Sequence, residues 1–76
     1  MEKLMKILKD LRPEVDFEKE DKLIENGIID SFDLVALVGE INEVFGVEVE
    51  FEDMEPENFN SAENIYKMIC RLENEV

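Results

Sequence analysis

The residues of this chain that could take part in chemistry gather in the segment 26–34, which reads Asn-Gly-Ile-Ile-Asp-Ser-Phe-Asp-Leu. A turn at Asn26-Gly27 and two apolar residues lead to Asp30-Ser31, directly before an amphipathic helical pattern. We therefore expect the Ser31 hydroxyl at the positive end of a helix, outside the core. Free backbone N–H groups and the helix dipole would stabilise an anion attached there. The chain otherwise lacks groups for catalysis, so Ser31 is predicted to be modified rather than to attack a substrate.

The composition excludes several kinds of catalytic and metal site. The chain has 76 residues, no histidine, no tryptophan and a single cysteine, Cys70. Nucleophile–histidine catalysis and a Cys/His zinc site are therefore excluded, and we predict no catalytic residue, no metal site and no enzyme activity. A lone cysteine forms no internal disulfide and fits a reducing compartment. No apolar run is long enough for a membrane span and no signal peptide is visible, so we expect a cytoplasmic protein.

The charge of the chain is strongly negative and unevenly placed. The formal net charge is −13, with +2 over residues 1–12, −14 over residues 13–60 and −1 over the rest. Such a field repels nucleic acid and anionic lipid and attracts proteins with basic patches. A simpler interpretation is that the acidic residues only keep a small domain soluble.

Hydrophobic periodicity predicts an all-α fold. We expect a first helix over residues 2–11, a second over 31–45, a short helical turn from Pro56 to Phe59, and a last helix that begins near residue 60. Residues 13–30 form a long connection with apolar anchors and room for a helical turn at 20–25. A connection of this length in a compact chain is usually functional, and here it would present Ser31.

The second helix has two different faces. Leu34, Leu37, Val38, Ile41, Val44 and Phe45 fall on one side and are predicted to face the core. Phe32, Val35, Ala36 and Gly39 lie largely on the opposite side, with Asp33, Glu40 and Glu43 around them. This exposed apolar strip beside Ser31 predicts a docking surface, although the apolar residues could instead fold back onto the preceding loop. A glycine inside a helix costs on the order of 1 kcal/mol, and close approach of a partner helix would explain Gly39.

Three further expectations concern the second half of the chain. The alternating segment 47–51 is read as extended, with Val47, Val49 and Phe51 pointing inward. Asn60 is predicted to cap the last helix together with Glu63, as in a capping box. The apolar stripe of that helix is predicted to consist of Ala62, Ile65, Tyr66, Ile69, Leu72 and Val76, with Cys70 at its side.

The segment Gly-Ile-Ile-Asp-Ser-Phe-Asp-Leu resembles the Gly-x-x-Asp-Ser-Leu/Met motif of acyl and peptidyl carrier proteins. The resemblance extends over nearly the whole chain. Leu23 matches the apolar position ahead of the glycine, and Phe45-Gly46-Val47 is similar to the end of the second helix in that family. Asn60-Ser61-Ala62 is similar to the start of the last helix. The resemblance implies one carrier domain over residues 1–76, folded as a small four-helix bundle of three main helices and a short one.

The family resemblance implies a function in two stages. A phosphopantetheinyl transferase would move 4'-phosphopantetheine from coenzyme A to Ser31, and Asp30 would assist recognition or metal placement by the transferase. The thiol of the arm would then carry an acyl or aminoacyl group between enzymes as a thioester. The implied partners are a loading ligase and downstream transferases with basic patches, which would dock on Phe32, Asp33, Val35, Gly39, Glu40 and Glu43. We expect the carrier itself to be a monomer.

Several residues differ from those usual in fatty-acid carriers, and these differences bear on which group the protein carries. Phe32 follows the serine where leucine is common, and Ala36 and Gly39 stand where glutamate and methionine are usual. The separation between Phe45 and Asn60-Ser61 resembles that of D-alanyl carrier proteins. These features favour a specialised freestanding carrier over the alternative, a carrier for fatty-acid synthesis.

A different class of function uses no arm at all. In an acidic adaptor that binds its partners non-covalently, Ser31 would only begin a helix, which is a common position for serine.

Overall fold

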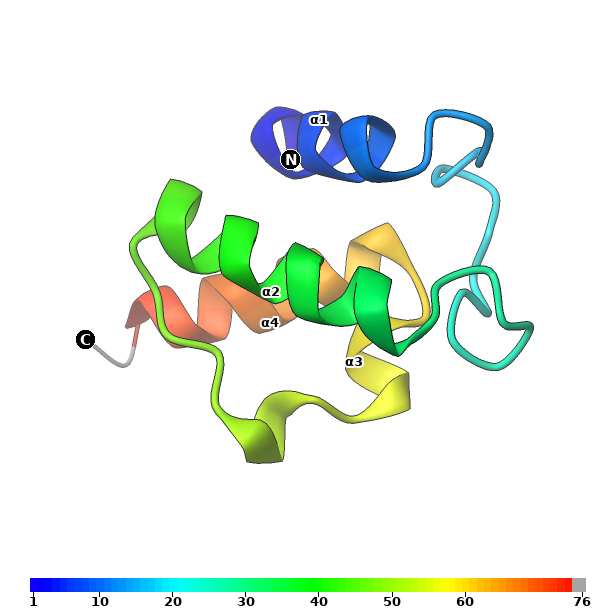
Figure 1. The fold of residues 1–76 in the computed structure, drawn as a ribbon. Helices are drawn as coiled ribbons and strands as arrows, with labels where there is room; N and C mark the ends of the chain where they lie inside the picture. The colour runs from blue at the N-terminus through cyan, green and yellow to red at the C-terminus, as the bar shows by residue number, and fades with distance from the viewer. Residues whose placement is uncertain (75–76) are drawn as a thin grey trace.

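A computed structural model describes residues 1–74 of the chain and shows an all-α fold (Figure 1). The elements, in order, are α1 (Glu2–Leu11), α2 (Ser31–Phe45), the 3-10 helix η1 (Phe51–Asp53), α3 (Pro56–Phe59) and α4 (Ala62–Asn74). No strand occurs within these described residues. The predicted small helical bundle is confirmed, with three main helices, one short helix and a long connection between α1 and α2. None of the helices described is long and apolar enough to cross a membrane.

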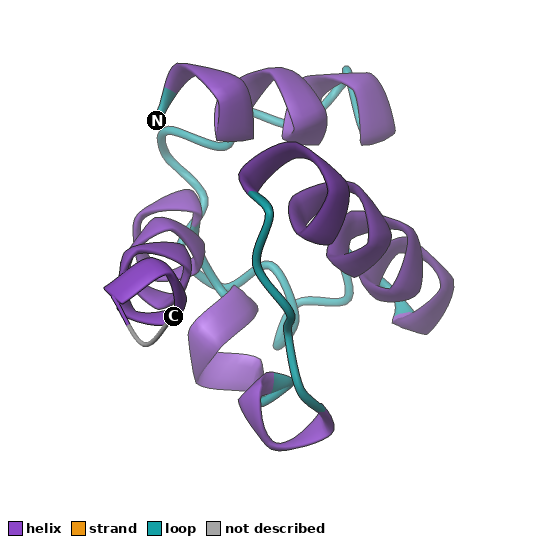
Figure 2. Ribbon diagram, turned by 90° about the vertical axis from the view of Figure 1, so that its left-hand side faces the viewer, coloured by secondary structure: helices purple, strands orange, loops and turns teal. Residues whose placement is uncertain are grey.

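The three long helices surround one core. α1 contacts both α2 and α4, and α2 also contacts α4, so each long helix packs on the other two (Figures 1 and 2). α3 packs against α4. The largest side chains with almost no exposed surface are Phe17, Phe59, Leu4, Leu8, Leu23, Leu37, Ile41, Ile65 and Ile69. Two of these, Phe17 and Leu23, come from the connection between α1 and α2, so this connection is part of the core.

The core face of α2 is confirmed with one exception. Leu37 and Ile41 are fully buried, and Leu34, Val38 and Phe45 are partly buried against the core. Val44 is the exception, because its side chain is 41% exposed and lines a groove between α1 and α2. The helix ends at Gly46, which has φ +65° and donates its N–H to the Asn42 carbonyl at 3.1 Å, as is typical of a glycine at the C-terminal end of a helix.

The segment after α2 is extended only as far as residue 50. Val47 and Val49 are buried as predicted, and the Val49 N–H donates to Asn42 Oδ1 at 2.9 Å. The prediction for Phe51 is wrong, because this side chain is 91% exposed. The alternation of inward and outward residues stops where η1 begins, since a 3-10 helix repeats every three residues rather than every two. Asp53, not Phe51, takes the buried position.

Asn60 does not cap α4, contrary to the prediction. Ser61 takes that place, since its Oγ accepts the Asn64 N–H at 3.1 Å one turn into the helix. The Asn60 side chain instead accepts the N–H groups of Ile24 and Glu25, at 3.0 and 3.2 Å, and its carbonyl accepts the Leu23 N–H at 2.8 Å. Asn60 therefore fastens the α1–α2 connection to the start of α4.

The apolar stripe of α4 is largely as predicted. Ala62, Ile65, Ile69 and Leu72 are buried and Tyr66 is partly buried, while Met68 joins the core as an additional residue. Val76 lies outside the described residues. Cys70 is a half-buried free thiol beside this stripe.

Candidate functional site

Ser31 is the first residue of α2, and its side chain is exposed. Asp30 before it is the N-cap, since its Oδ1 accepts the Asp33 N–H at 2.9 Å. The Asp33 carboxylate accepts the Asp30 N–H in return at 3.4 Å, which completes a capping box. Ser31 thus lies in the sequence between the two residues of this capping box. No hydrogen bond occupies its hydroxyl within residues 1–74.

The backbone beside Ser31 can receive an anion. Neither the Ser31 N–H nor the Phe32 N–H has a hydrogen-bond acceptor in the described part of the chain, whereas the Asp33 N–H is capped. The 15 residues of α2 stand behind these two donors, so the positive end of the helix dipole lies at the same place. A negatively charged group on the Ser31 oxygen would therefore be stabilised locally.

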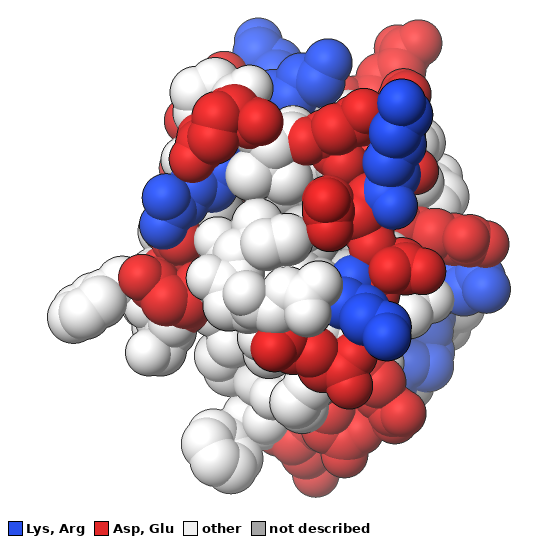
Figure 3. Space-filling view, turned by 90° about the vertical axis from the view of Figure 1, so that its right-hand side faces the viewer, with Lys and Arg blue, Asp and Glu red and all other residues white. Residues whose placement is uncertain are grey.

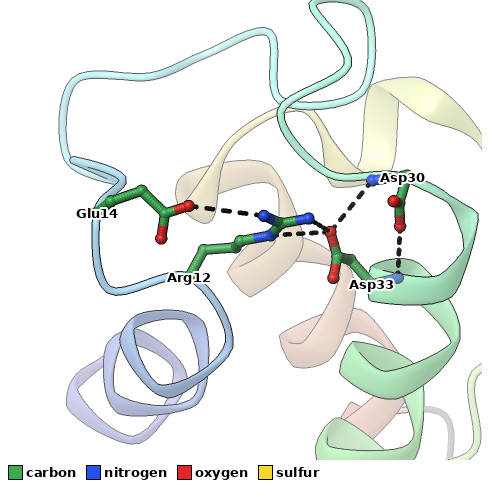
Figure 4. A network of polar contacts seen from close by, with 4 residues as sticks. All are labelled: Arg12, Glu14, Asp30 and Asp33. Carbon is green, nitrogen blue, oxygen red and sulfur yellow. Dashed lines mark hydrogen bonds and ion pairs between the residues drawn. The ribbon is translucent and has the colours of Figure 1, made fainter.

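Arg12 brings a positive charge to the start of α2, beside the carboxylates of Asp30 and Asp33 (Figure 4). It directly follows α1, and its Nε and Nη2 donate to Asp33 Oδ2 at 3.0 and 2.5 Å. The Arg12 guanidinium, aided by the Asp30 N–H, holds the pKa of the Asp33 carboxyl below its usual range. Nη1 of Arg12 also lies 3.6 Å from Oε2 of Glu14. Because Arg12 occupies the Asp33 carboxylate, the exposed carboxylate left beside Ser31 in the sequence is that of Asp30.

Backbone hydrogen bonds and a buried side chain fix the connection that precedes Ser31. The Leu23 carbonyl accepts the N–H groups of Ile28 and Ile29, at 2.9 and 3.1 Å, and Gly27 makes the turn between them with φ +69°. Ile29 is only 2% exposed. Because Ile29 is buried two residues before Ser31, it fixes the direction in which the chain enters α2. The Ser31 hydroxyl therefore faces solvent.

Most of the predicted docking residues are exposed along α2. Phe32 and Val35 are 87% and 66% exposed, so they do not fold back onto the loop. Gly39, Glu40 and Glu43 are exposed as well. Val35 and these three residues line the groove between α1 and α2, whereas Phe32 lies outside it. Asp33 differs from the rest, because its side chain is only 16% exposed and is bonded to Arg12.

Figure 3 looks onto the side of the molecule that carries the α1–α2 connection and the start of α2. Acidic side chains surround an uncharged area in the middle and left of this view, with basic side chains between them. The site therefore lies in a predominantly acidic surface that is not uniform.

Arg12 and Asn60 are the two residues near the site whose roles the sequence did not predict. The only sequence signal for Arg12 is compositional, since two of the eight basic residues are arginines, and the structure shows that each of these arginines donates to a mostly buried aspartate. Asn60 has no comparable signal, since an asparagine before a helix is normally read as its cap.

An all-α bundle that presents an exposed serine and free backbone N–H groups at the start of its second helix has the architecture of a carrier domain. Comparison with protein families supports this class: the family described as "Phosphopantetheine attachment site" matches residues 2–69. The chain belongs to this family, whose domains carry covalently attached 4'-phosphopantetheine and act as carriers rather than catalysts. Neither the curated proteins nor the solved structures that were compared contain a match.

Proposed function

We propose that Ser31 is the residue that receives 4'-phosphopantetheine. The observation that carries this proposal is the exposed Ser31 hydroxyl beside two free backbone N–H groups at the start of a long helix. In the transfer, the Ser31 oxygen bonds to the phosphorus of the pantetheine phosphate of coenzyme A. Adenosine 3',5'-bisphosphate leaves, and the serine proton passes to a base of the transferase. The terminal thiol of the arm then holds an acyl or aminoacyl group as a thioester.

Asp30 is the residue of this chain best placed to assist the transferase. One of its oxygens caps α2, and the side chain remains exposed beside Ser31. A carboxylate in this position suits contact with a basic group or with Mg²⁺ held by the transferase. Asp33 is less available for such a contact, because Arg12 already occupies its carboxylate.

The partner enzymes dock, in this proposal, along the exposed side of α2. Phe32 and Val35 supply apolar surface next to the arm, while Glu40 and Glu43 supply negative charge. Partners with basic patches would associate fast and in a salt-sensitive manner. Binding has to stay weak, since one carrier visits several enzymes in turn.

For the cargo we propose an amino acid or another small acyl unit, as in D-alanyl carriers. The support comes from the three positions at which α2 departs from fatty-acid carriers, Phe32, Ala36 and Gly39, all of which are exposed. A surface with an aromatic residue and two very small residues presents a different shape to loading enzymes. Charging of the holo protein by a D-alanine ligase, but not by malonyl transfer, would support this assignment, and the reverse would favour fatty-acid synthesis.

The attachment is tested by intact mass spectrometry after incubation with coenzyme A and a broad-specificity phosphopantetheinyl transferase. We expect one phosphopantetheine on the wild type, none on Ser31→Ala, and one on Ser61→Ala. Ser61 is a matched control, because it is the only other serine and also stands at a helix start. An unchanged wild-type mass would defeat the carrier assignment of Ser31 and favour the non-covalent adaptor.

A further inference from the structure

A groove of about 850 Å³ runs between α1 and α2. Apolar side chains from both helices line it, including Ile7 and Leu11 from α1 and Val35 and Val44 from α2. It begins one helical turn after Ser31 and extends along α2 to Val44. The groove therefore starts close to the proposed attachment site, and one of its walls is α1, which the sequence did not implicate in docking.

Gly39 forms part of this groove and serves no packing purpose inside the molecule. A Cβ placed on Gly39 would meet no atom within 4 Å, so the fold itself leaves room for a side chain. Glycine at a mid-helix position costs about 1 kcal/mol relative to alanine, and nothing within the described residues offsets that cost. Together with Ala36 one turn earlier, Gly39 leaves few side-chain atoms on the α2 side of the groove, so a partner can approach the helix closely.

The two walls of the groove carry opposite charges. Lys3 and Lys6 stand on the α1 wall, with Asp10 at its end near Ser31, and Glu40 and Glu43 stand on the α2 wall. No ion pair joins either lysine to either glutamate among residues 1–74, although all four side chains are exposed. The walls thus stay open and present unpaired charges of opposite sign across an apolar floor.

We infer that this groove docks an amphipathic helix of a partner protein that carries basic residues along one flank and acidic residues along the other. Its apolar ridge would enter the groove over Gly39, its basic flank would face Glu40 and Glu43, and its acidic flank would face Lys3 and Lys6. The inference rests on the proposed function for the place of docking. It differs from the proposed function in two respects. The partner also contacts α1, and its docking helix carries both basic and acidic residues rather than basic residues alone.

Charge complementarity selects this occupant. A uniformly basic helix would place positive charge against the α1 wall, where Lys3 and Lys6 repel it. A second copy of the chain is disfavoured, because each copy carries a net charge of −13.

Three synthetic helical peptides with the same leucine stripe test the inference. One peptide has lysines on one flank and glutamates on the other, the second has lysines on both flanks, and the third has glutamates on both. Dissociation constants for the unmodified protein are measured at about 150 mM salt, where long-range attraction to the acidic surface is screened. We expect the mixed peptide to bind about three- to tenfold more tightly than the all-lysine peptide, the size of one or two exposed ion pairs. Tightest binding of the all-lysine peptide would overturn the inference.

A matched pair of variants locates the α1 wall. Lys6→Glu and Lys9→Glu make the same charge change at exposed positions of α1, but only Lys6 lines the groove. Lys6→Glu should shift the preference to the all-lysine peptide, whereas Lys9→Glu should keep the wild-type order. The same shift in both variants would show that overall charge, and not the groove, sets the preference.

Gly39→Leu tests the groove without damage to the fold. The new side chain points into open space, so we expect wild-type helicity by circular dichroism and at least a tenfold loss of binding of the mixed peptide. Retained binding would contradict the inference. Ser31→Ala should bind the peptide normally, which separates this test from the attachment test. Weaker binding by the holo protein than by the unmodified protein would mean that the arm occupies the groove, and would also overturn the inference.

Discussion

At the start of α2 and at the start of η1, an aspartate accepts the backbone N–H of the residue three positions earlier and also an arginine from another part of the chain. Asp33 accepts from Asp30 and Arg12. Asp53 accepts from Glu50 at 3.1 Å and from Arg71 at 3.0 Å. In both cases the arginine holds the pKa of the aspartate below its usual range.

The residues between the paired positions differ. Asp30 and Asp33 enclose Ser31 and Phe32, whereas Glu50 and Asp53 enclose Phe51 and Glu52. The first cluster also has the 15-residue helix α2 behind it, while η1 has three residues and no helix dipole of comparable size. The charge-paired aspartate is therefore a structural device that this chain uses twice. A hydroxyl in front of a long helix distinguishes the first cluster from the second, and it is the basis on which we propose the first cluster as the attachment site.

The largest difference between the two clusters is expected in attachment of the arm, and it is tested by placing a serine in the second cluster. Phe51 is exposed, so Phe51→Ser should fold normally. In a Ser31→Ala background we expect this variant to acquire no phosphopantetheine, because residue 51 lacks the long helix and the α1–α2 groove. Intact mass after incubation with the transferase and coenzyme A decides the question. An arm on residue 51 would show that the four-residue pattern is sufficient by itself.

A smaller effect is expected on stability, and there the second cluster should matter more. Asp53→Ala removes the two side-chain contacts of Asp53, with the Glu50 N–H and with Arg71, at a cost of about 1–2 kcal/mol in the free energy of unfolding. Asp33→Ala should cost less, because Asp30 still caps the Asp33 position of α2 through its side chain.

Urea denaturation measures the free energy of unfolding of the Asp53→Ala and Asp33→Ala variants. Glu52→Ala is the control, since Glu52 is an exposed acid in η1. Asp53→Ala should also acquire the arm at the wild-type rate. Equal stability of the Asp53 and Asp33 variants would remove the distinction between a structural cluster and a functional one.

The sequence predicts the local features of this fold but not the long-range contacts in the two clusters. The bounds of α1 and α2 and the exposure of Phe32, Val35, Ala36 and Gly39 follow from periodicity, and they are confirmed. Both arginine–aspartate contacts were missed, because they join residues 21 and 18 positions apart and no local pattern marks them.

The errors at Phe51 and Asn60 have the same origin. Alternation along residues 47–50 does not tell where the chain turns into a 3-10 helix. The cap preference of asparagine does not tell that Leu23, Ile24 and Glu25 lie beside it in the fold. Local propensity fixed the helices, and contacts between distant segments decided the rest.

The smallest effect is expected in acid, where the two clusters should behave alike. The pKa of Asp33 and that of Asp53 are both lowered in the folded protein, with the bonded arginine as the first cause. A lowered folded-state pKa contributes stability that is fully present above the unfolded value, about 3.9, and that is lost as the pH falls through the lower folded value.

Asp33→Asn and Asp53→Asn keep a side-chain oxygen but cannot ionise. Each should therefore be modestly less stable than the wild type at pH 7, and the gap should close below about pH 4. Melting temperatures between pH 7 and pH 3 measure this gap, with Glu52→Gln as the reference. A gap that stays constant over this range would mean that shape, rather than charge, holds the arginines in both clusters.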